Sequence, residues 1–184
     1  MSDVYPAPII KLRQAENTKT PIETLIELSK NKHWHIRSVV AQNPNTPAET
    51  INELAEDKDW EVRASAVRNP KISINALLKF SKQEDEGLHY YIAANPSTTA
   101  EVLINLAQHK NSDTLYWIAR NPNCPEAMRL WIDNGGFAGL SLTEFLEKVG
   151  KDINILFDSE MHQGTMTTLI ELCSSLLMAT SNAS

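Results

Sequence analysis

The chain has 184 residues, of which 42% are hydrophobic and 22% charged, a balance typical of a globular protein with a core. The net charge of -6 argues against a protein that binds nucleic acid through the phosphate backbone. Two cysteines do not make a disulfide framework, and no apolar run approaches the ~18 residues that span a membrane. The first residues, MSDVYPAPIIKLRQ, lack the apolar segment of a secretory signal. We therefore expect a cytoplasmic protein with reduced thiols and no membrane partner.

An asparagine recurs along the chain at a spacing of 26 residues, at Asn17, Asn43, Asn69, Asn95 and Asn121. Taking each asparagine as column 1 of a unit aligns residues 17–133 without a gap, and columns 9 and 12 are apolar in almost every unit. A fixed period of this length predicts a solenoid, because each unit buries its apolar face only by stacking on the next. Residues 1–16 are expected to cap the array or to remain loose.

Each unit is predicted to contain two short helices. Thr20, Thr46 and Thr98 each precede a glutamate by three residues, which is the pattern of a capping box at a helix N-terminus. Pro21 and Pro47 then fall at the first helical position, where the missing N–H is tolerated. The apolar columns 6, 9, 12 and 13 share one face of this first helix.

The second helix of each unit is predicted to begin near column 17, where Asp59, Asp85 and Asn111 are good N-caps. Its apolar columns are 20, 24 and 25. Proline at column 2 disfavours helical geometry at the preceding residue, so the helix should stop at the asparagine. Asparagine also tolerates unusual backbone angles and bonds its own neighbours. We favour this turn-forming role over a row of asparagines that binds a ligand.

Asn43-Pro44-Asn45-Thr46-Pro47, Asp59-Trp60-Glu61-Val62-Arg63 and Arg68-Asn69-Pro70 carry a resemblance to the leucine-rich repeat variant family. The resemblance covers residues 17–133 and is strongest over residues 43–70. It implies an all-α fold, a right-handed superhelical α-solenoid, here of about four and a half two-helix units of 26 residues. The longer unit suggests a fully α-helical second helix, as in HEAT or armadillo repeats. The family's iron–sulfur centre is not expected, because no cysteine precedes Cys124, and no cofactor is predicted.

Arg37 and Arg63 share column 21, beside the apolar columns, and we expect them to bond carboxylates or carbonyls of the adjoining unit rather than a ligand. Trp34 and Trp60 share column 18, and we expect both rings to pack in the core.

Outward-facing positions of the second helix carry the main functional signal. Columns 22 and 23 are small or aliphatic in the first two units, but aromatic in the next two, at Tyr90, Tyr91, Tyr116 and Trp117. Stacking should gather these rings, with Arg120 of column 26 at their border. Aromatic residues beside an arginine are typical of a protein-binding hot spot. The alternative is that the C-terminal segment covers the rings.

Other polar residues give little support for catalysis or metal binding. His33 and His35 do not share a helical face and have no acidic partner at metal-ligand spacing, and no metal is predicted. His89, His109 and His162 look isolated. Cys124 occupies an N-cap column, where a thiolate is favoured, although a small cap-filling residue is the simpler interpretation.

The repeat register fails after Trp131. Residues 141–150 and 165–179 are predicted to be helical, and residues 137–184 are expected to form a C-terminal helical cap over the last unit. A partner-binding or dimerising tail is the alternative.

The preferred function is a non-enzymatic protein-binding scaffold or adaptor, whose partner is another protein, for instance a bacterial toxin that it neutralises. The alternative is a nucleic-acid-binding, HEAT-like solenoid, which would need a basic stripe. Arg68 and Arg120 share column 26, but Gln42 and Ala94 interrupt it. An enzyme is a third possibility, and no grouping of acid, base and nucleophile supports it.

Overall fold

The structure is a computed structural model, which describes residues 6–83, 86–109 and 111–133. Within these ranges the chain forms α-helices and no β-strand, which confirms the all-α class. The helices are α1 (Pro6–Glu16), α2 (Ile22–Leu28), α3 (Trp34–Gln42), α4 (Ala48–Leu54), α5 (Trp60–Arg68), α6 (Ile74–Ser81), α7 (Glu86–Ala94), α8 (Ala100–Ala107), α9 (Ser112–Arg120) and α10 (Glu126–Asp133). None of the helices described is long and apolar enough to cross a membrane. The predicted cap at 137–184 lies outside the described residues.

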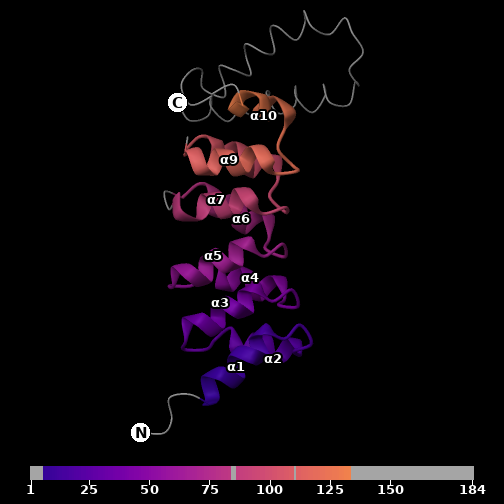
Figure 1. Cartoon of the computed structure of the whole chain (residues 1–184), viewed down its shortest axis with the longest axis vertical. Coiled ribbons are helices and arrows are strands. Elements are labelled where there is room, and N and C mark those ends of the chain that lie inside the picture. The colour runs from indigo at the N-terminus through magenta and orange to yellow at the C-terminus, as the bar shows by residue number, and fades with distance from the viewer. Residues whose placement is uncertain (1–5, 84–85, 110, 134–184) are drawn as a thin grey trace, which may run out of the picture.

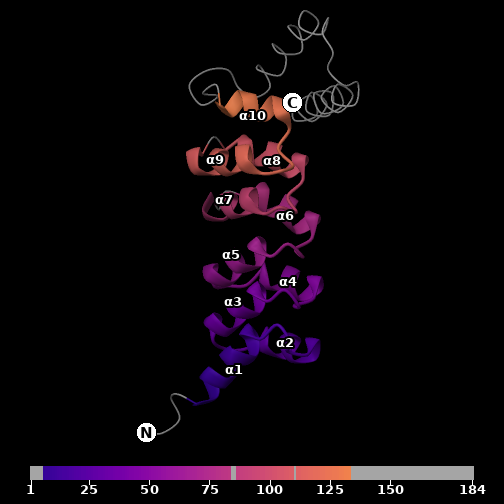
Figure 2. The same ribbon diagram turned by 45° about the vertical axis from the view of Figure 1, so that its right-hand side comes forward.

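The helices form an elongated stack, with α1 at one end and α10 at the other (Figure 1). Figure 2 shows two parallel rows, one of α1, α3, α5, α7 and α9 and the other of α2, α4, α6 and α8. Neighbours within the first row pack directly on one another, from α1 against α3 to α7 against α9. The second helix of every unit is α-helical, as the longer period suggests.

The core consists of the same columns in successive units. Column 9 is fully buried at Leu25, Ile51, Leu77 and Leu103, and column 24 at Val40, Ala66, Ile92 and Ile118. Helix α1 follows the same register, because Ala15 lies one period before Ala41 and both are fully buried. The N-terminal helix therefore stacks as a second helix without a first-helix partner of its own among the described residues.

The column 1 asparagines join each unit to the one before it. Side-chain Nδ2 atoms of Asn43, Asn69, Asn95 and Asn121 donate to the carbonyls of Ala15, Ala41, Val67 and Ala93, at 2.7, 2.7, 2.6 and 2.7 Å. The same amides reach the carbonyl of the preceding column 1 asparagine, at 3.2, 3.4, 3.1 and 2.9 Å. The accepting carbonyls lie at or just after the last turn of a second helix, where no intrahelical N–H is available to them. Each asparagine directly follows one second helix and caps the second helix before that one; Asn69, for example, follows α5 and caps α3.

The asparagines also make the turn that the sequence predicts. Each second helix ends at the residue before the asparagine, and the side-chain Oδ1 of Asn69 accepts from the backbone N–H of Lys71 at 2.9 Å. The backbone at Asn43, Asn69 and Asn121 is extended, with φ near -70° and ψ between 126° and 134°. The unusual backbone angles that we expected are therefore absent at these asparagines, because a following proline already favours the extended region.

An arginine takes over the asparagine's role at the end of the array. Arg129 donates from Nε to the carbonyl of Ala119 at 3.0 Å and from Nη2 to that of Asn121 at 3.4 Å. These carbonyls correspond to those of Ala93 and Asn95 one unit earlier. One period after Asn121 the sequence has Glu147, which has no amide to donate. The guanidinium therefore satisfies the carbonyls that a further column 1 asparagine would otherwise bond.

The predicted capping boxes do not form. The hydroxyls of Thr20, Thr46 and Thr98 donate to carbonyls six residues earlier, at 2.6, 2.6 and 2.5 Å. Pro21 and Pro47 lie at the N-cap position rather than the first helical position, so the threonines precede the helix by two residues. The buried hydroxyls therefore bond carbonyls at the end of the preceding helix and do not cap the helix that follows.

The N-caps of the second helices are confirmed in position but differ in chemistry. Asn111 accepts from the backbone N–H groups of Asp113 and Thr114, both at 3.1 Å. Asp59 occupies the same position without a side-chain cap bond, and its carboxylate instead contacts Arg37. Asp85 lies outside the described residues.

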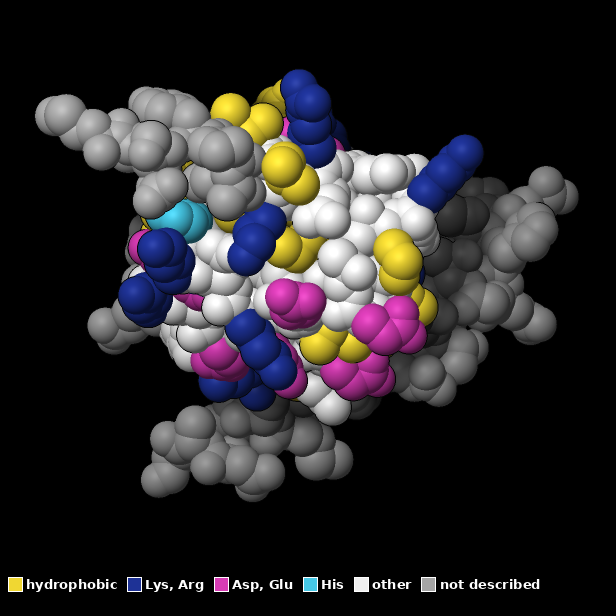
Figure 3. Space-filling view, turned by 90° about the horizontal axis from the view of Figure 1, so that it is seen from below, with side chains coloured by type: hydrophobic (Ala, Val, Ile, Leu, Met, Phe, Trp, Pro, Cys, Tyr) yellow, Lys and Arg dark blue, Asp and Glu magenta, His cyan; other side chains and the backbone are white. Residues whose placement is uncertain are grey.

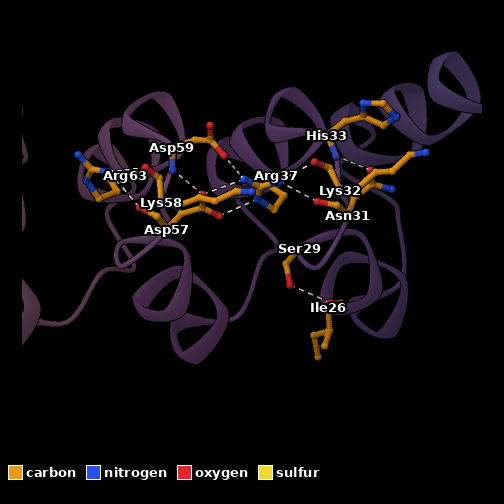
Figure 4. Close-up of polar contacts among 10 residues, drawn as sticks. All are labelled: Ile26, Ser29, Asn31, Lys32, His33, Arg37, Asp57, Lys58, Asp59 and Arg63. Atoms are coloured by element: carbon orange, nitrogen blue, oxygen red, sulfur yellow. Dashed lines mark hydrogen bonds and ion pairs between the residues drawn. The ribbon is translucent and has the colours of Figure 1, made fainter.

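Arg37 forms a buried polar network that links the first two units, as predicted for column 21 (Figure 4). Its Nε and Nη2 atoms donate to the two carboxylate oxygens of Asp57 at 2.6 and 2.8 Å, and Nη1 donates to the carbonyls of Asn31 and Lys32. The hydrogen bond from Arg37 lowers the pKa of Asp57, and the same bond raises the pKa of Arg37. Arg63 donates to two backbone carbonyls, those of Asp57 and Lys58, which belong to its own unit and not to the adjoining one.

The core packing predicted for the column 18 tryptophans is wrong. Trp34 is 45% exposed and Trp60 is 36% exposed. Both are the first residue of a second helix, so their side chains lie at the rim of the stack. Trp34 contacts the neighbouring ring of His35, and Trp60 contacts Tyr91 of the next unit.

We expect Asn69→Ala to lower the free energy of unfolding by about 2 kcal/mol, because two buried carbonyls lose their donor. Asn69→Asp should cost at least as much, since a carboxylate cannot donate. The exposed Asn75→Ala on α6 serves as the control, and its effect should stay within about 0.5 kcal/mol. Urea unfolding followed by circular dichroism measures all three, and equal effects at the two positions would contradict the cross-unit role.

We expect Asp57→Asn to cost about 2–4 kcal/mol at pH 7, because Arg37 loses its bidentate partner. The pKa of Asp57 is lower in the folded chain than in the unfolded one, so its contribution is present above the unfolded pKa of ~4 and lost as pH falls through the folded pKa. We therefore expect the free energies of unfolding of the wild type and of Asp57→Asn, measured in urea, to differ at pH 7 and to become more similar below pH ~4. Glu56→Gln, which removes an exposed ion pair with Lys79, should cost less than about 1 kcal/mol. An equal difference in the free energy of unfolding at pH 7 and pH 3 would refute the assignment of Asp57 as the ionised partner of Arg37.

Candidate functional site

Contacts between neighbouring second helices follow a regular pattern. Between α3 and α5, the Oγ atoms of Ser38 in column 22 and Ser65 in column 23 lie 2.8 Å apart, and Gln42 in column 26 bonds the same Ser65 at 3.1 Å. Columns 22 and 26 of one helix thus contact column 23 of the next. Small residues close this junction, and Ser38, Ala64 and Ser65 are buried. The outward orientation predicted for columns 22 and 23 is therefore wrong for the first two units.

The junction between α5 and α7 replaces serine by an aromatic residue. Tyr91 occupies column 23, and the guanidinium carbon of Arg68 lies 5.3 Å from the centre of its ring. The ring centroids of Trp60 and Tyr90 lie 5.9 and 3.8 Å from that of Tyr91. The tyrosine rings are too large to be enclosed between the helices, and both are half-buried.

The junction between α7 and α9 is open. Trp117 occupies column 23, and the column 26 residue opposite it is the small Ala94 instead of glutamine or arginine. A groove of about 290 Å³ forms here, lined by Arg68, Tyr90, Tyr91, Ala94, Asn95 and Trp117. The side chain of Trp117 is 41% exposed. The groove therefore combines three aromatic rings, one guanidinium and a floor that includes an alanine.

Tyr116 and Arg120 lie beside Trp117 on α9 and do not belong to the lining of the groove. The guanidinium of Arg120 lies over the ring of Tyr116, 3.5 Å from its centroid, and Nη1 donates to the Tyr116 carbonyl at 3.2 Å. The Tyr116 ring meets Trp117 edge to face, with centroids 5.6 Å apart, and is 50% exposed. Three of the five predicted residues thus line the groove, and the other two lie next to Trp117 on the same helix.

We call Tyr90, Tyr91, Tyr116, Trp117, Arg120 and Arg68 the aromatic surface. The first five are the predicted residues, and the structure places them together. Sequence reasoning missed Arg68 and its stacking on Tyr91, although Arg68 shares column 26 with Arg120. In the sequence, Ala94 interrupts a basic stripe in column 26, whereas in the structure its small side chain lines the groove.

Charges divide along the helices of this surface. Arg68 and Arg120 lie in the last turns of α5 and α9, and Glu61 and Asp113 lie in the first turns of the same helices. Burial raises the pKa of Tyr90 to about 12, so its phenol stays neutral at physiological pH. The arginine end of the aromatic surface carries positive charge because Arg68 and Arg120 both lie there.

The histidines give a partial correction to the sequence analysis. His33 and His35 are exposed, and no group of three or more potential metal ligands occurs in the described part of the chain. His89 and His109 are not isolated, because their rings lie 4.3 Å apart. Each Nε2 atom lies about 3 Å from a backbone carbonyl, that of Gln83 or Ser81. His162 lies outside the described residues.

Cys124 has a buried thiol and not an activated one. Its sulfur is buried near the carbonyl of Pro125, and burial raises the pKa of the thiol to about 11. A neutral thiol is a poor nucleophile at physiological pH. Cys124 shares the column of Thr20, Thr46 and Thr98 and precedes α10 by two residues, so it does not fill the N-cap position that the sequence predicts.

Residues 87–140 match the family model of the Leucine Rich Repeat Variant domain. The predicted resemblance to this family is confirmed over that range, which includes most of α7, all of α8 to α10 and some residues beyond the described part. The segment that shows the resemblance most clearly by eye, residues 43–70, precedes the matched range. No curated protein and no solved structure matches the chain.

Because its thiol has a pKa of about 11, Cys124 should be roughly 0.1% thiolate at pH 8. In a Cys173→Ser variant, we expect Cys124 to react with Ellman's reagent about 100-fold more slowly than free cysteine, and the rate should keep rising up to pH 11. The same variant unfolded in urea should react at the ordinary rate. Fast reaction of the folded protein at pH 8 would show that the thiol is accessible and ionised.

Proposed function

We propose that the protein is a non-enzymatic scaffold or adaptor that binds another protein through the aromatic surface. The observation that carries this proposal is the open junction between α7 and α9, where a groove of about 290 Å³ is lined by three aromatic rings and Arg68. Aromatic and arginine side chains dominate the binding energy of protein interfaces. The Leucine Rich Repeat Variant match supports an interaction role, because stacked repeats offer extended surfaces for partners.

The proposed scaffold is a right-handed superhelix of about four and a half units, with residues 137–184 as its C-terminal cap. The row of second helices, α3 to α9, lines the surface on which the partner lies. The cap protects the stacking face of the last unit, as terminal repeats do in other arrays.

Binding without catalysis agrees with the polar groups that are described. The thiol of Cys124 is buried with a raised pKa, and Arg37 is fully engaged by Asp57, Asp59 and two carbonyls. Cys124 and Arg37 thus belong to the packing of the stack. Neutralising a partner such as a bacterial toxin in the cytoplasm is one task that this scaffold would perform.

Nucleic-acid binding is the less favoured function. Figure 3, which views the stack along its axis from the α1 end, shows acidic and basic side chains interspersed on that face. The net charge of -6 opposes a polyanion. At the aromatic surface itself, Glu61 and Asp113 lie on the same helices as the two arginines.

We expect the double substitution Tyr116→Ala and Trp117→Ala to abolish capture of the protein partner from an extract of the source cell. Truncation of two central aromatic residues typically weakens binding by about 2 kcal/mol or more for each hot-spot residue, which is a loss of about 30-fold or more. Quantitative mass spectrometry of the captured proteins provides the measurement. Both rings are substantially exposed, so thermal unfolding should change little.

The matched control is the double substitution Ile22→Ala and Ile74→Ala. These side chains are 49% and 50% exposed on α2 and α6, in the other row of helices. The two substitutions remove an exposed apolar area comparable to that removed with Tyr116 and Trp117, but at positions away from the aromatic surface. Equal capture by the wild type and the Tyr116/Trp117 variant would show that the partner binds elsewhere.

A further inference from the structure

We infer that the groove between α7 and α9 takes an acidic segment of a protein partner, in which a carboxylate is adjacent to an aromatic residue or proline. This inference deepens the proposed function, because it names the chemistry of the segment that the aromatic surface binds. The carboxylate lies at the arginine end of the groove, and the ring of the adjacent residue lies against Tyr91 and Trp117.

The shape of the groove supports a flat apolar side chain as one part of the ligand. In the preceding junctions, the column 23 residue is covered by a column 26 side chain, by Gln42 on Ser65 and by Arg68 on Tyr91. Opposite Trp117 that position holds Ala94, and the groove forms there. A ring or proline from the partner would cover Trp117 as Arg68 covers Tyr91.

The charges support a carboxylate as the other part. Arg68 lines the groove and is exposed, and within the described ranges its guanidinium contacts a ring and no carboxylate. Arg120, in the same column two units later, is held over the ring of Tyr116 and is also exposed. A guanidinium on an aromatic ring keeps N–H donors at its edge, which suit a carboxylate. Arginine therefore stands on either side of Ala94 along column 26.

The acidic residues of the same helices give the ligand a direction. Glu61 and Asp113 belong to the first turns of α5 and α9, at the opposite ends from Arg68 and Arg120. A carboxylate that enters near these residues would be repelled, whereas one at the helix C-terminal ends meets two guanidinium groups. A polyphosphate chain crossing the surface would meet both ends, so these charges favour a peptide with localised acidic residues.

Selection of a 12-residue random peptide library, displayed on phage, against the immobilised full-length protein tests the inference. We expect selected peptides to be enriched in Asp or Glu next to Phe, Tyr, Trp or Pro. Fluorescence polarisation with a selected peptide should show binding that weakens about tenfold or more with Arg68→Gln, and similarly with Trp117→Ala. Raising the salt concentration should also weaken it.

Lys30→Gln is the matched control, because it removes one exposed cation next to α2, away from the groove. It should leave peptide affinity within about twofold of the wild type. Thermal unfolding of all variants should coincide, since Arg68, Trp117 and Lys30 are exposed.

The outcomes separate the inference from the proposed function. Selected peptides that are basic or purely apolar, and that depend on Trp117, would overturn the acidic occupant but leave a protein-binding groove. A selected peptide that is displaced by a 12-nucleotide single-stranded RNA, with RNA binding lost in Arg68→Gln, would overturn both in favour of nucleic acid. Failure to select any peptide that depends on Trp117 would overturn both the acidic occupant and the groove as the binding surface.

Discussion

One amide group in each of four units, the side-chain Nδ2 of the column 1 asparagine, ties successive second helices together. The amide of Asn69, which follows α5, donates to carbonyls at the end of α3, and its own oxygen holds the turn that follows. A helix end buried without such partners would cost free energy for each unpaired carbonyl. The same side chain therefore ends one helix, starts the next turn and sets the distance between units, and the remaining packing of the array depends on that spacing.

The side chains that differ most in size between units lie in columns that do not join the units together. Columns 1, 9 and 24 hold the stack, whereas columns 22, 23 and 26 meet at the junctions between second helices. Two serines close the junction between α3 and α5, and bulky rings keep that between α7 and α9 open. The groove arises from a change of side-chain size within an otherwise regular fold, and it requires no insertion or special loop.

Periodicity made most of the fold predictable from the sequence, including the helix pairs, the buried columns and the stop at each asparagine. The chemistry of the turns was harder to predict. The capping boxes had the correct residues at the correct spacing, yet Thr46 bonds the helix behind it, because a buried hydroxyl takes the nearest orphan carbonyl. The five residues of the predicted interface lie on neighbouring second helices because equal columns stack. Arg68 was missed because a stripe of charge was sought, whereas its role depends on the ring of Tyr91 in the next unit and on the small size of Ala94. The exposure of Trp34 could not be inferred from a helical wheel, which does not show where a helix begins relative to the rim.

The row of column 1 amides also explains why the units between Asn17 and Asn121 share one length of 26 residues. Inserting one residue anywhere between two asparagines would rotate the second amide by about 100° and shift it by about 1.5 Å if the residue entered a helix. The amide would then miss both carbonyls, and every later unit would inherit the error. Deletion has the same effect, so such a protein can gain or lose material only in whole units. Arg129 donates to the last pair of carbonyls, those of Ala119 and Asn121, and therefore marks the end of the regular units. Changes in the length of this array during evolution should therefore come from duplication or loss of complete repeats ahead of that arginine, while point substitutions at the junctions alter what is recognised.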